Sequence, residues 1–273
     1  MVNILYLFIN LEQDQSRRSL MQRSASRLGL TFQRVSAFDL QRLGKEPTQH
    51  AKSTGYRNER WGLRPFEIAV FESHRRAWSI FLQSDAELCV VMEDDLLFAE
   101  FFRDAIDAAA KVGDRFDIVK INHSVQPRLM GRPKSISNGH ILRPILENVS
   151  DAGCYLLTRH AAKVLLQRSQ GYSSHLDDFV FSPDRRLRTF QLFQPACGQI
   201  IHLDDVAKST DFTVSTRLLQ TDHVIKGPRP FRVWKELRRI TKRTGWKIRA
   251  FFKRGERVDM RSLLTDFVPI KVD

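Results

Sequence analysis

The chain has 273 residues, of which 42% are hydrophobic and 10% aromatic, and its net charge is +13. This length suits one large domain with an appendage, or two small domains, and the composition can bury a substantial core and excludes a disordered tail and a fibrous protein. Three widely spaced cysteines indicate neither a disulfide framework nor a CxxC metal site, which favours a reducing compartment. No window approaches the roughly 20 apolar residues that cross a bilayer. The short apolar segment 1–9 is typical of a buried strand rather than a signal peptide.

Strand-like and helix-like segments alternate over the first two-thirds of the chain. Strands are predicted at 4–11, 31–35, 88–92 and 116–121, and helices at 17–28, 66–83 and 101–112. The first helix is expected to end at Gly29, and Pro65 can open the second. The polar stretch 40–60 has no apolar period and is expected to be a loop. This alternation favours an α/β fold with a mixed, mostly parallel sheet flanked by helices.

The composition changes at the turn-rich tetrapeptide Gly227-Pro228-Arg229-Pro230, which predicts a main domain over 1–225 and an extension over 226–273. Between Lys226 and Arg257 there are 13 lysines and arginines but only two glutamates, so nearly all of the excess charge lies there. We expect a basic helical extension with a break at Thr244-Gly245. Apolar residues recur at near-helical spacing on both sides of that break: Phe231, Trp234, Leu237, Ile240, Trp246, Ile248, Phe251 and Phe252.

This basic, aromatic extension favours attachment to an anionic membrane surface. Lys and Arg near an anionic leaflet contribute roughly 1 kcal/mol each, and interleaved Trp and Phe anchor a helix at headgroup level. The alternative is a solvated basic helix. A nucleic-acid-binding protein would also suit the charge, but the charge is confined to one end and no RNP, helix-turn-helix or zinc-finger pattern is present. No nucleic-acid partner is therefore expected.

The strongest local signal for chemistry is Glu93-Asp94-Asp95, directly after the apolar run 88–92. Ligands of open α/β sheets bind outside the carboxyl ends of the strands. If the strand continues, Glu93 and Asp95 face one side and Asp94 the other. Two oxygen ligands on one side suit Mg²⁺ or Mn²⁺, which hold nucleotide phosphates and keep some waters. The alternative is a solvated acidic turn that caps the next helix.

The predicted helix 66–83 contains a second constellation. Glu67 and His74 are seven residues apart and fall on nearly the same helical face, with Phe71 between them. Together with Ser73 they could line a sugar or nucleotide pocket. The alternative, favoured on spacing alone, is that the aromatic residues are core and His74 is a satisfied, partly buried histidine.

Two further acidic clusters, His175-Leu176-Asp177-Asp178 and His202-Leu203-Asp204-Asp205, follow later in the chain. A histidine after a strand can complete a metal site, and an aspartate opposite it can act as a general base. Surface turns with the same composition are commoner, so each cluster alone is a weak signal. A Mg²⁺-dependent phosphotransferase or nuclease could use such carboxylates too, although no P-loop GxxxxGK[ST] is present.

Several motifs stand in a fixed order along residues 3–205. They are Ile9-Asn10-Leu11 with Arg17-Arg18, FQRVSAFD at 32–39, Glu67-Ile68 with Ser73-His74 and Trp78, Glu93-Asp94-Asp95, GCYLLTR at 153–159 with Ala161-Ala162, and His175-Leu176-Asp177-Asp178. This ordered set resembles glycosyltransferase family 25, the bacterial lipopolysaccharide-type galactosyltransferases. The chain departs from the family at Ala69-Val70, where Gly-Cys is usual, and at Leu40, where Gly usually follows Asp39. These departures would reshape the edge of the donor pocket.

The resemblance implies a glycosyltransferase-A (Rossmann-like) fold, a UDP-sugar donor, a divalent cation (Mn²⁺ or Mg²⁺) and inversion at the anomeric carbon. It implies a metal-dependent transfer of a hexose, galactose by family default, to a lipopolysaccharide or lipooligosaccharide core. The acceptor would then be a lipid-linked oligosaccharide. The anionic membrane surface would be met through Lys226–Arg257, and the protein would be cytoplasmic, peripheral on the inner face of the plasma (inner) membrane.

The same resemblance, combined with the chemistry of the side chains, assigns candidate roles. Asn10, Ala37 and Asp39 would contact uridine, and Arg17 would approach the nucleotide. Glu93 and Asp95 would hold the metal, with His202 as a further candidate ligand. Inversion needs a base on the face opposite the leaving group, for which Asp178 is the first choice and Asp177 the second. The remaining substrate-binding candidates are Glu67, Ser73, His74 and Asp94.

Overall fold

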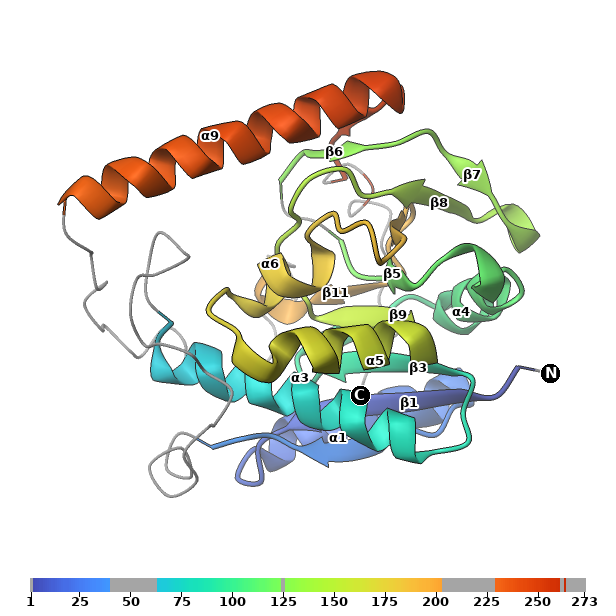
Figure 1. Cartoon of the computed structure of the whole chain (residues 1–273). Helices are drawn as coiled ribbons and strands as arrows, with labels where there is room; N and C mark the ends of the chain where they lie inside the picture. Colours follow the sequence, from blue (N-terminus) through green and yellow to red (C-terminus); the bar gives the residue numbers. More distant parts are fainter. Residues whose placement is uncertain (1, 40–62, 124–125, 203–228, 261–262, 264–273) are drawn as a thin grey trace.

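The computed structural model describes residues 2–39, 63–123, 126–202, 229–260 and 263 (Figure 1). At its centre is an eight-stranded sheet with the order β2-β1-β3-β9-β5-β10-β8-β7. Its strands are β1 (Ile4–Asn10), β2 (Gln33–Ser36), β3 (Leu88–Glu93), β5 (Ile118–Lys120), β7 (Lys134–Ser135), β8 (Ile141–Pro144), β9 (Cys154–Thr158) and β10 (Thr189–Leu192). Two further antiparallel pairs are β4 (Leu96–Phe98) with β11 (Cys197–Gln199), and β6 (Arg128–Met130) with β12 (Glu256–Val258).

Helices cover both faces of the sheet. The α-helices are α1 (Gln15–Leu28), α3 (Pro65–Gln83), α4 (Phe102–Ala110), α5 (Arg159–Arg168), α6 (Leu176–Phe181) and α9 (Arg229–Phe252). Short 3-10 helices are η1 (Gly113–Arg115), η2 (Ser137–Gly139), η3 (Ser169–Gly171) and η4 (Ile200–His202). Among the described residues, no helix is both long enough and apolar enough to cross a membrane.

The strand directions confirm the predicted α/β class with a mixed, mostly parallel sheet. β1 pairs in parallel with β2 and β3, and β5 pairs in parallel with β10. β9 is antiparallel to both β3 and β5, and β8 is antiparallel to β10 and β7. Six of the eight strands therefore point the same way, and only β9 and β8 run against them.

The core divides into two layers, one on each face of the sheet. In β1, Leu7 and Ile9 face the layer that contains α3, α5 and α6, whereas Tyr6 and Phe8 face the layer that contains α1 and α4. Alternate residues of a strand point to opposite faces, so an apolar strand such as β3, fully buried from Leu88 to Met92, requires cover on both. The result is a three-layer α/β/α arrangement.

The ends of the first two helices follow the predicted signals. The carboxylate of Asp14 accepts a hydrogen bond from the backbone N–H of Arg17 at the start of α1. Gly29 closes α1 with φ of 62°, in the left-handed region that glycine adopts without a steric penalty. Pro65 occupies the first turn of α3 as predicted. The polar stretch 40–60 lies outside the described residues.

The C-terminal extension contains the predicted basic helix, α9, but the predicted break at Thr244-Gly245 is wrong. α9 runs without interruption through both residues, and Thr244 Oγ1 donates to the carbonyl of Ile240 at 3.0 Å. An isolated glycine inside a helix costs only about 1 kcal/mol relative to alanine, which weakens a helix without ending it.

The extension returns to the main domain after α9. β12 adds to the edge of β6, pairing Glu256 with Met130 and Val258 with Arg128. Val258 and Met260 bury their side chains against Met130. The division into 1–225 and 226–273 stays a prediction, but this strand pairing ties the end of the extension to the body of the protein.

Candidate active site

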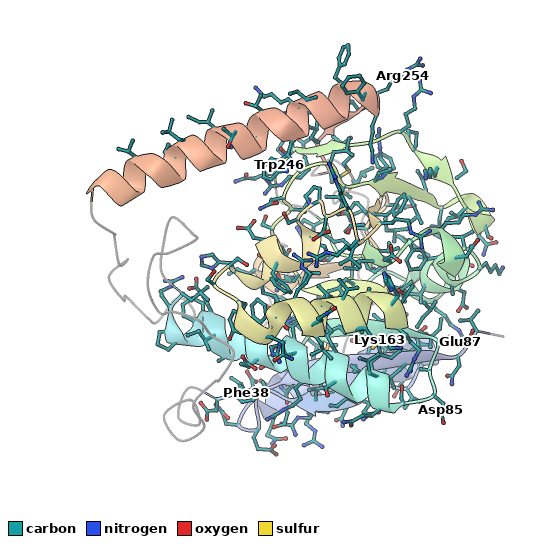
Figure 2. The ribbon with its side chains drawn as sticks, in the orientation of Figure 1. Phe38, Asp85, Glu87, Lys163, Trp246 and Arg254 are labelled. Atoms are coloured by element: carbon teal, nitrogen blue, oxygen red, sulfur yellow. The ribbon has the colours of Figure 1, made fainter. Side chains whose placement is uncertain are left out.

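The carboxyl ends of three neighbouring strands bring the predicted nucleotide-binding and metal-binding residues to one edge of the sheet. Asn10 of β1 lies opposite Ser36 of β2, and Ile9 lies opposite Glu93 of β3. The backbone N–H of Ala37 donates to the carbonyl of Asn10 at 3.0 Å. In Figure 2, Phe38, which follows β2, lies at the lower left of the domain, and Asp85, which precedes β3, lies at its lower right, so they mark opposite ends of these strands.

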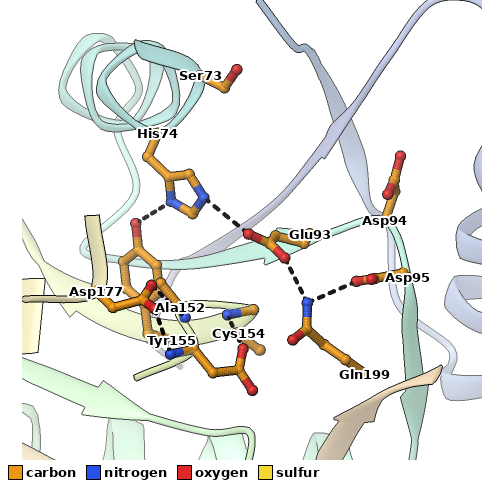
Figure 3. Close-up of polar contacts among 12 residues, drawn as sticks. Ser73, His74, Glu93, Asp94, Asp95, Ala152, Cys154, Tyr155, Asp177 and Gln199 are labelled. Atoms are coloured by element: carbon orange, nitrogen blue, oxygen red, sulfur yellow. Dashed lines mark hydrogen bonds and ion pairs between the residues drawn. The ribbon is translucent and has the colours of Figure 1, made fainter. Parts of the chain in front are cut away.

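Glu93 and Asp95 converge on one side chain, as Figure 3 shows. The amide nitrogen of Gln199 donates to Glu93 Oε2 at 2.6 Å and to Asp95 Oδ1 at 3.1 Å. Gln199 belongs to β11, and its side chain is buried. The predicted pairing of Glu93 with Asp95 on one side of the strand is confirmed.

Asp94 points the other way, also as predicted. Its carboxylate accepts from Asn10 Nδ2 at 2.8 Å and from Arg17 Nη1 at 3.0 Å. Burial raises the pKa of Asp94, while the Arg17 charge and both hydrogen bonds oppose that rise. Asp94 therefore ties the end of β3 to β1 and to the first turn of α1, and it holds Arg17 at the site's edge.

The ionised form of Asp95 is only partly compensated by its surroundings. Burial and repulsion from Glu93 raise the pKa of Asp95 to about 7, and Arg17 only partly offsets this. Two adjacent, partly buried carboxylates that share one neutral amide repel each other when both are ionised. The pair is therefore strained in the absence of a positive charge.

A divalent cation fits the chemistry of these side chains. Glu93 and Asp95 supply carboxylate oxygens, and Gln199 can present its amide oxygen instead of its nitrogen after a half-turn of the amide, because the two ends are told apart only by the hydrogen bonds they make. Within the described ranges, no group of three or more His, Cys, Asp or Glu side chains forms a complete metal site. The side chain of His202 lies outside them. A small number of protein ligands is enough for Mg²⁺ or Mn²⁺, because these ions retain waters and take substrate phosphates as further ligands.

His74 is buried and linked to this pair. Its Nδ1 lies 2.8 Å from the hydroxyl of Tyr155, and its Nε2 lies 3.9 Å from Glu93 Oε1. Trp78 Nε1 donates to the same hydroxyl at 2.8 Å. The indole N–H of Trp78 can only donate, so the tyrosine hydroxyl accepts from it and donates its own proton to His74 Nδ1. With Nδ1 as the acceptor, the imidazole has its own proton on Nε2, which faces Glu93. The core interpretation of His74 is thus compatible with a role in orienting Glu93.

Ser73 holds the segment that follows β2. Its hydroxyl accepts from the backbone N–H of Phe38 at 2.8 Å and donates to the carbonyl of Ala69 at 2.7 Å. Arg76 bonds the carbonyl of Ser36 and lies over the Phe38 ring. The hydroxyl of Ser73 is engaged within the protein, and its contribution is to fix residues 36–39, with Asp39 at their end.

Glu67 is engaged at the start of α3. It accepts from the backbone N–H of Arg64 at 2.7 Å and contacts His175 Nδ1 at 3.2 Å. Burial alone raises the pKa of Glu67, but the hydrogen bonds from His175 and Arg64 outweigh it and the pKa is lowered. Since His175 is the N-cap residue of α6, Glu67 braces the helix that carries the candidate bases.

Asp177 and Asp178 occupy different surroundings. Asp177 accepts from the backbone N–H groups of Asp151 at 2.8 Å and of Ala152 at 3.1 Å. Asp178 accepts from the side-chain amide of Asn148. The carboxylate of Asp177 thus holds the backbone of the loop before β9. The carboxylate of Asp178 contacts a side chain instead, that of Asn148.

Asp151 was not predicted from the sequence. Its φ is 75°, a conformation that non-glycine residues rarely adopt and that occurs often at functional sites. Oδ1 accepts from the backbone N–H of Gly153 at 3.1 Å. A Cβ on Gly153 would lie 3.2 Å from Asp151 Oδ1 and 3.1 Å from Gln199 Cγ, so Asp151 is close to the side chain that bridges Glu93 and Asp95. Burial raises the pKa of Asp151 to about 6, against the opposing charge of Lys120 and with a smaller contribution from repulsion by Glu93 and Asp177.

Lys120 was also missed, although its position gave a signal. It lies near the end of the predicted strand 116–121, and a lysine in such an apolar run needs a buried partner. Its Nζ donates to the carbonyls of Asp151 at 2.6 Å and of His123 at 3.1 Å, and to Asn122 Oδ1 at 2.6 Å. Lys120 therefore places a cation beneath the acidic edge and helps to hold Asp151 in its unusual conformation.

A shallow surface hollow elsewhere contains none of these residues. It lies between α1 and α4 and is lined by Arg27, Leu28, Glu100, Arg103, Asp104 and Asp107. Because α1 and α4 cover the face of the sheet away from α3 and α6, this hollow is separate from the acidic edge.

Comparison with protein families gives a match over residues 4–180 to glycosyltransferase family 25 (LPS biosynthesis protein). The chain belongs to glycosyltransferase family 25. It is therefore a glycosyltransferase. The matched region runs from β1 to α6, so it includes Glu93, Asp95 and both candidate bases but ends before Gln199 and α9.

No curated protein matches this family-25 glycosyltransferase. Solved structures that match the chain include the mannose-1-phosphate geranyltransferase from Thermus thermophilus (10% identity, TM-score 0.38, covering 70% of this chain and 74% of that one). The inositol-1-phosphate CTP transferase from T. maritima is comparable (12% identity, TM-score 0.40, covering 72% of this chain and 89% of that one). Values this low bear on neither substrate nor chemistry.

Proposed function

We propose that this family-25 glycosyltransferase transfers a hexose, with galactose as the first choice, from a UDP-sugar to a lipopolysaccharide or lipooligosaccharide core, with inversion. The observation that carries the proposal is the convergence of Glu93 and Asp95 on one point at the carboxyl edge of a buried sheet. Carboxylates in that position suit a cation and the diphosphate of a nucleotide sugar.

The donor would lie along the ends of β1 and β2. Ala37 and Asp39 are the candidates for uridine, on a segment fixed by Ser73 and Arg76. Asn10 would act by holding its neighbours in place, because its side-chain nitrogen donates to Asp94 and its side-chain oxygen accepts from Arg34 at 3.0 Å. This network holds the edge rigid, so that binding the nucleotide requires little reordering.

Glu93 and Asp95 would hold Mn²⁺ or Mg²⁺, with Gln199 as a further oxygen donor and His202 as the ligand expected from the resemblance. When bound, the cation offsets the negative charge that develops on the departing diphosphate. His74, held by Tyr155, has its Nε2 3.9 Å from Glu93 Oε1 and would help to orient this carboxylate.

Asp178 remains the first choice as general base. It would take the proton from the acceptor hydroxyl while the acceptor oxygen bonds to the anomeric carbon and the bond from that carbon to the diphosphate oxygen breaks. Asp177, the second choice, suits this task less well. Its two backbone hydrogen bonds favour the charged form and commit both of its oxygens to the loop at 151–152.

A lipid-linked oligosaccharide as acceptor would place the enzyme at a membrane, peripheral on its cytoplasmic inner face. The charge of Lys226–Arg257 supports this partner, since lysines and arginines near an anionic leaflet contribute roughly 1 kcal/mol each. Attachment of this kind brings the active site to an acceptor that cannot leave the bilayer.

A nucleotide-sugar screen tests the proposed function. Among UDP-, GDP- and ADP-sugars incubated with Mn²⁺, a UDP-hexose should be hydrolysed or should stabilise the protein against heat. Asp95→Ala should lose this Mn²⁺-dependent activity. Unchanged metal-dependent turnover by Asp95→Ala would remove Asp95 from the metal site. Cleavage of phosphodiesters in place of sugar transfer would instead indicate a phosphotransferase or nuclease.

A further inference from the structure

α9 presents an apolar stripe to the outside of the protein. The stripe consists of Val233, Leu237, Ile240, Ile248 and Phe251, whose side chains are between 53% and 81% exposed. Spacings of four, three, eight and three residues keep these side chains on one side of a helix that turns about 100° per residue. A surface helix of a soluble domain normally turns such a stripe toward the core.

The opposite side of α9 faces the domain. Ala250 is buried and Trp246, labelled in Figure 2, is half-buried. Two residues correspond to a rotation of roughly 200° around a helix, so both lie across the helix axis from Ile248. Near its C-terminal end, α9 therefore packs on the domain through the side opposite the stripe. The stripe faces outward there although the helix is supported by the domain.

Positive charge lies along one flank of the stripe. α9 contains nine lysines and arginines and one acidic residue, Glu236. Of the side chains that the structure describes, Arg243 and Lys247 are exposed, and their spacing puts them on the flank next to the stripe. An apolar stripe beside a basic face is the pattern of helices that lie in the interface of a membrane. Nucleic acid would satisfy the charge but leave the stripe in water.

We propose that α9 docks flat on an anionic bilayer, with the Val233–Phe251 stripe inserted at the boundary of headgroups and acyl chains and the flanking lysines and arginines on lipid phosphates. The proposal deepens the proposed function by naming the surface that meets the acceptor's membrane, and it rests on that function only for the identity of the acceptor. A helix of 24 residues extends about 36 Å, which is long enough to define an orientation.

The junction after α9 can transmit that orientation to the active site. The N–H of Gly255 donates to the carbonyl of Ala250 at 2.7 Å, and a Cβ on Gly255 would lie 2.5 Å from Leu146 Cδ1, so helix and domain meet tightly there. Arg257 in β12 lies 3.7 Å from Glu147. Residues 147–150 lead directly to Asp151, whose backbone Asp177 clamps. A docked α9 thus fixes the height of this loop above the bilayer.

Vesicle flotation of the full chain tests the proposal. Wild-type protein should float with vesicles of phosphatidylcholine and anionic phosphatidylglycerol, and less with phosphatidylcholine alone. Leu237→Gln combined with Ile240→Gln keeps the charge and suits a helix, and it should weaken partitioning about tenfold or more, since two aliphatic side chains lose their burial. Glu236→Gln, also exposed but off the stripe, is the matched control and should bind at least as well as wild type.

Three results would overturn the docking proposal. They are no flotation of wild type, equal flotation of the double variant, or a wild-type dimer in solution that is absent in the double variant, which would make the stripe a dimer interface. Equal competition by duplex DNA would reassign the basic flanks to nucleic acid. Transfer to a soluble oligosaccharide should be the same for wild type and double variant. If neither transfers, the proposed function fails, while the flotation result still decides the docking.

Discussion

Replacing Asp95 with asparagine should stabilise the protein when no divalent cation is present. Burial and Glu93 raise the pKa of Asp95 from 3.8 to about 7 in the folded state. The folded protein therefore binds this proton more tightly than the unfolded chain does. The cost of ionising Asp95 is absent below about pH 4, grows between pH 4 and pH 7, and stays nearly constant at higher pH.

The size of the effect follows from the shift. About three pKa units at 1.36 kcal/mol each give an upper value of roughly 4 kcal/mol at pH 8. Asp95→Asn keeps the shape and removes the charge, so we expect the free energy of unfolding at pH 8 to rise by about 1–4 kcal/mol, with each kcal/mol raising Tm by roughly 2–4 °C. At pH 4 the two proteins should differ little.

Thermal melts of both proteins at pH 4 and pH 8, with chelator or with Mn²⁺, measure this directly. Mn²⁺ should raise the Tm of wild type at pH 8 and leave that of Asp95→Asn nearly unchanged. Asp94→Asn is the control, because Asp94 is held by Arg17 and Asn10 and its replacement should destabilise. A lower Tm of Asp95→Asn at pH 8 than of wild type, both in chelator, would refute the reasoning.

Three more variants probe the neighbours of the acidic pair. Tyr155→Phe removes the hydroxyl that fixes the tautomer of His74 and should weaken Mn²⁺ binding about 10–100-fold; a titration followed by Tm or calorimetry checks this, and unchanged affinity would separate His74 from Glu93. Asp177→Asn should lower the free energy of unfolding by about 1.5–3 kcal/mol, since charged acceptors form the stronger hydrogen bonds, as measured by urea unfolding. Asp178→Asn should leave stability nearly unchanged and lower kcat by about 10²–10⁴; if Asp177→Asn alone lost kcat without losing stability, the two roles would be exchanged.

Much of the fold could be predicted because local signals and global packing agree. The apolar run 88–92 forms β3, Gly29 ends α1, and Pro65 opens α3. The alternation of Glu93, Asp94 and Asp95 about the strand end follows from the period of a strand alone. These features depend on residues close together in the chain, where the sequence is most informative.

The partners of those residues could not be predicted in the same way. Gln199 reaches Glu93 only because β11 pairs with β4, across about a hundred residues of sequence. The antiparallel insertion of β9 between β3 and β5 brings Asp151 to the site, and no local pattern indicates its positive φ. His74 illustrates a different limit, since spacing could not distinguish a core residue from a site residue, and the buried side chain lies 3.9 Å from Glu93.

The return of the chain from α9 to β6 affects how the membrane question can be approached in the laboratory. A protein shortened at Gly227 would lose the helix, but it would also strip the edge of β6 and expose Met130, which Val258 and Met260 now cover. Arg143 would lose Glu256 as well. Such a shortened protein would be prone to self-association through the exposed edge of β6, so its behaviour with lipid could not be assigned to the missing helix. Substitutions on the outer face of α9 test the helix without exposing that edge.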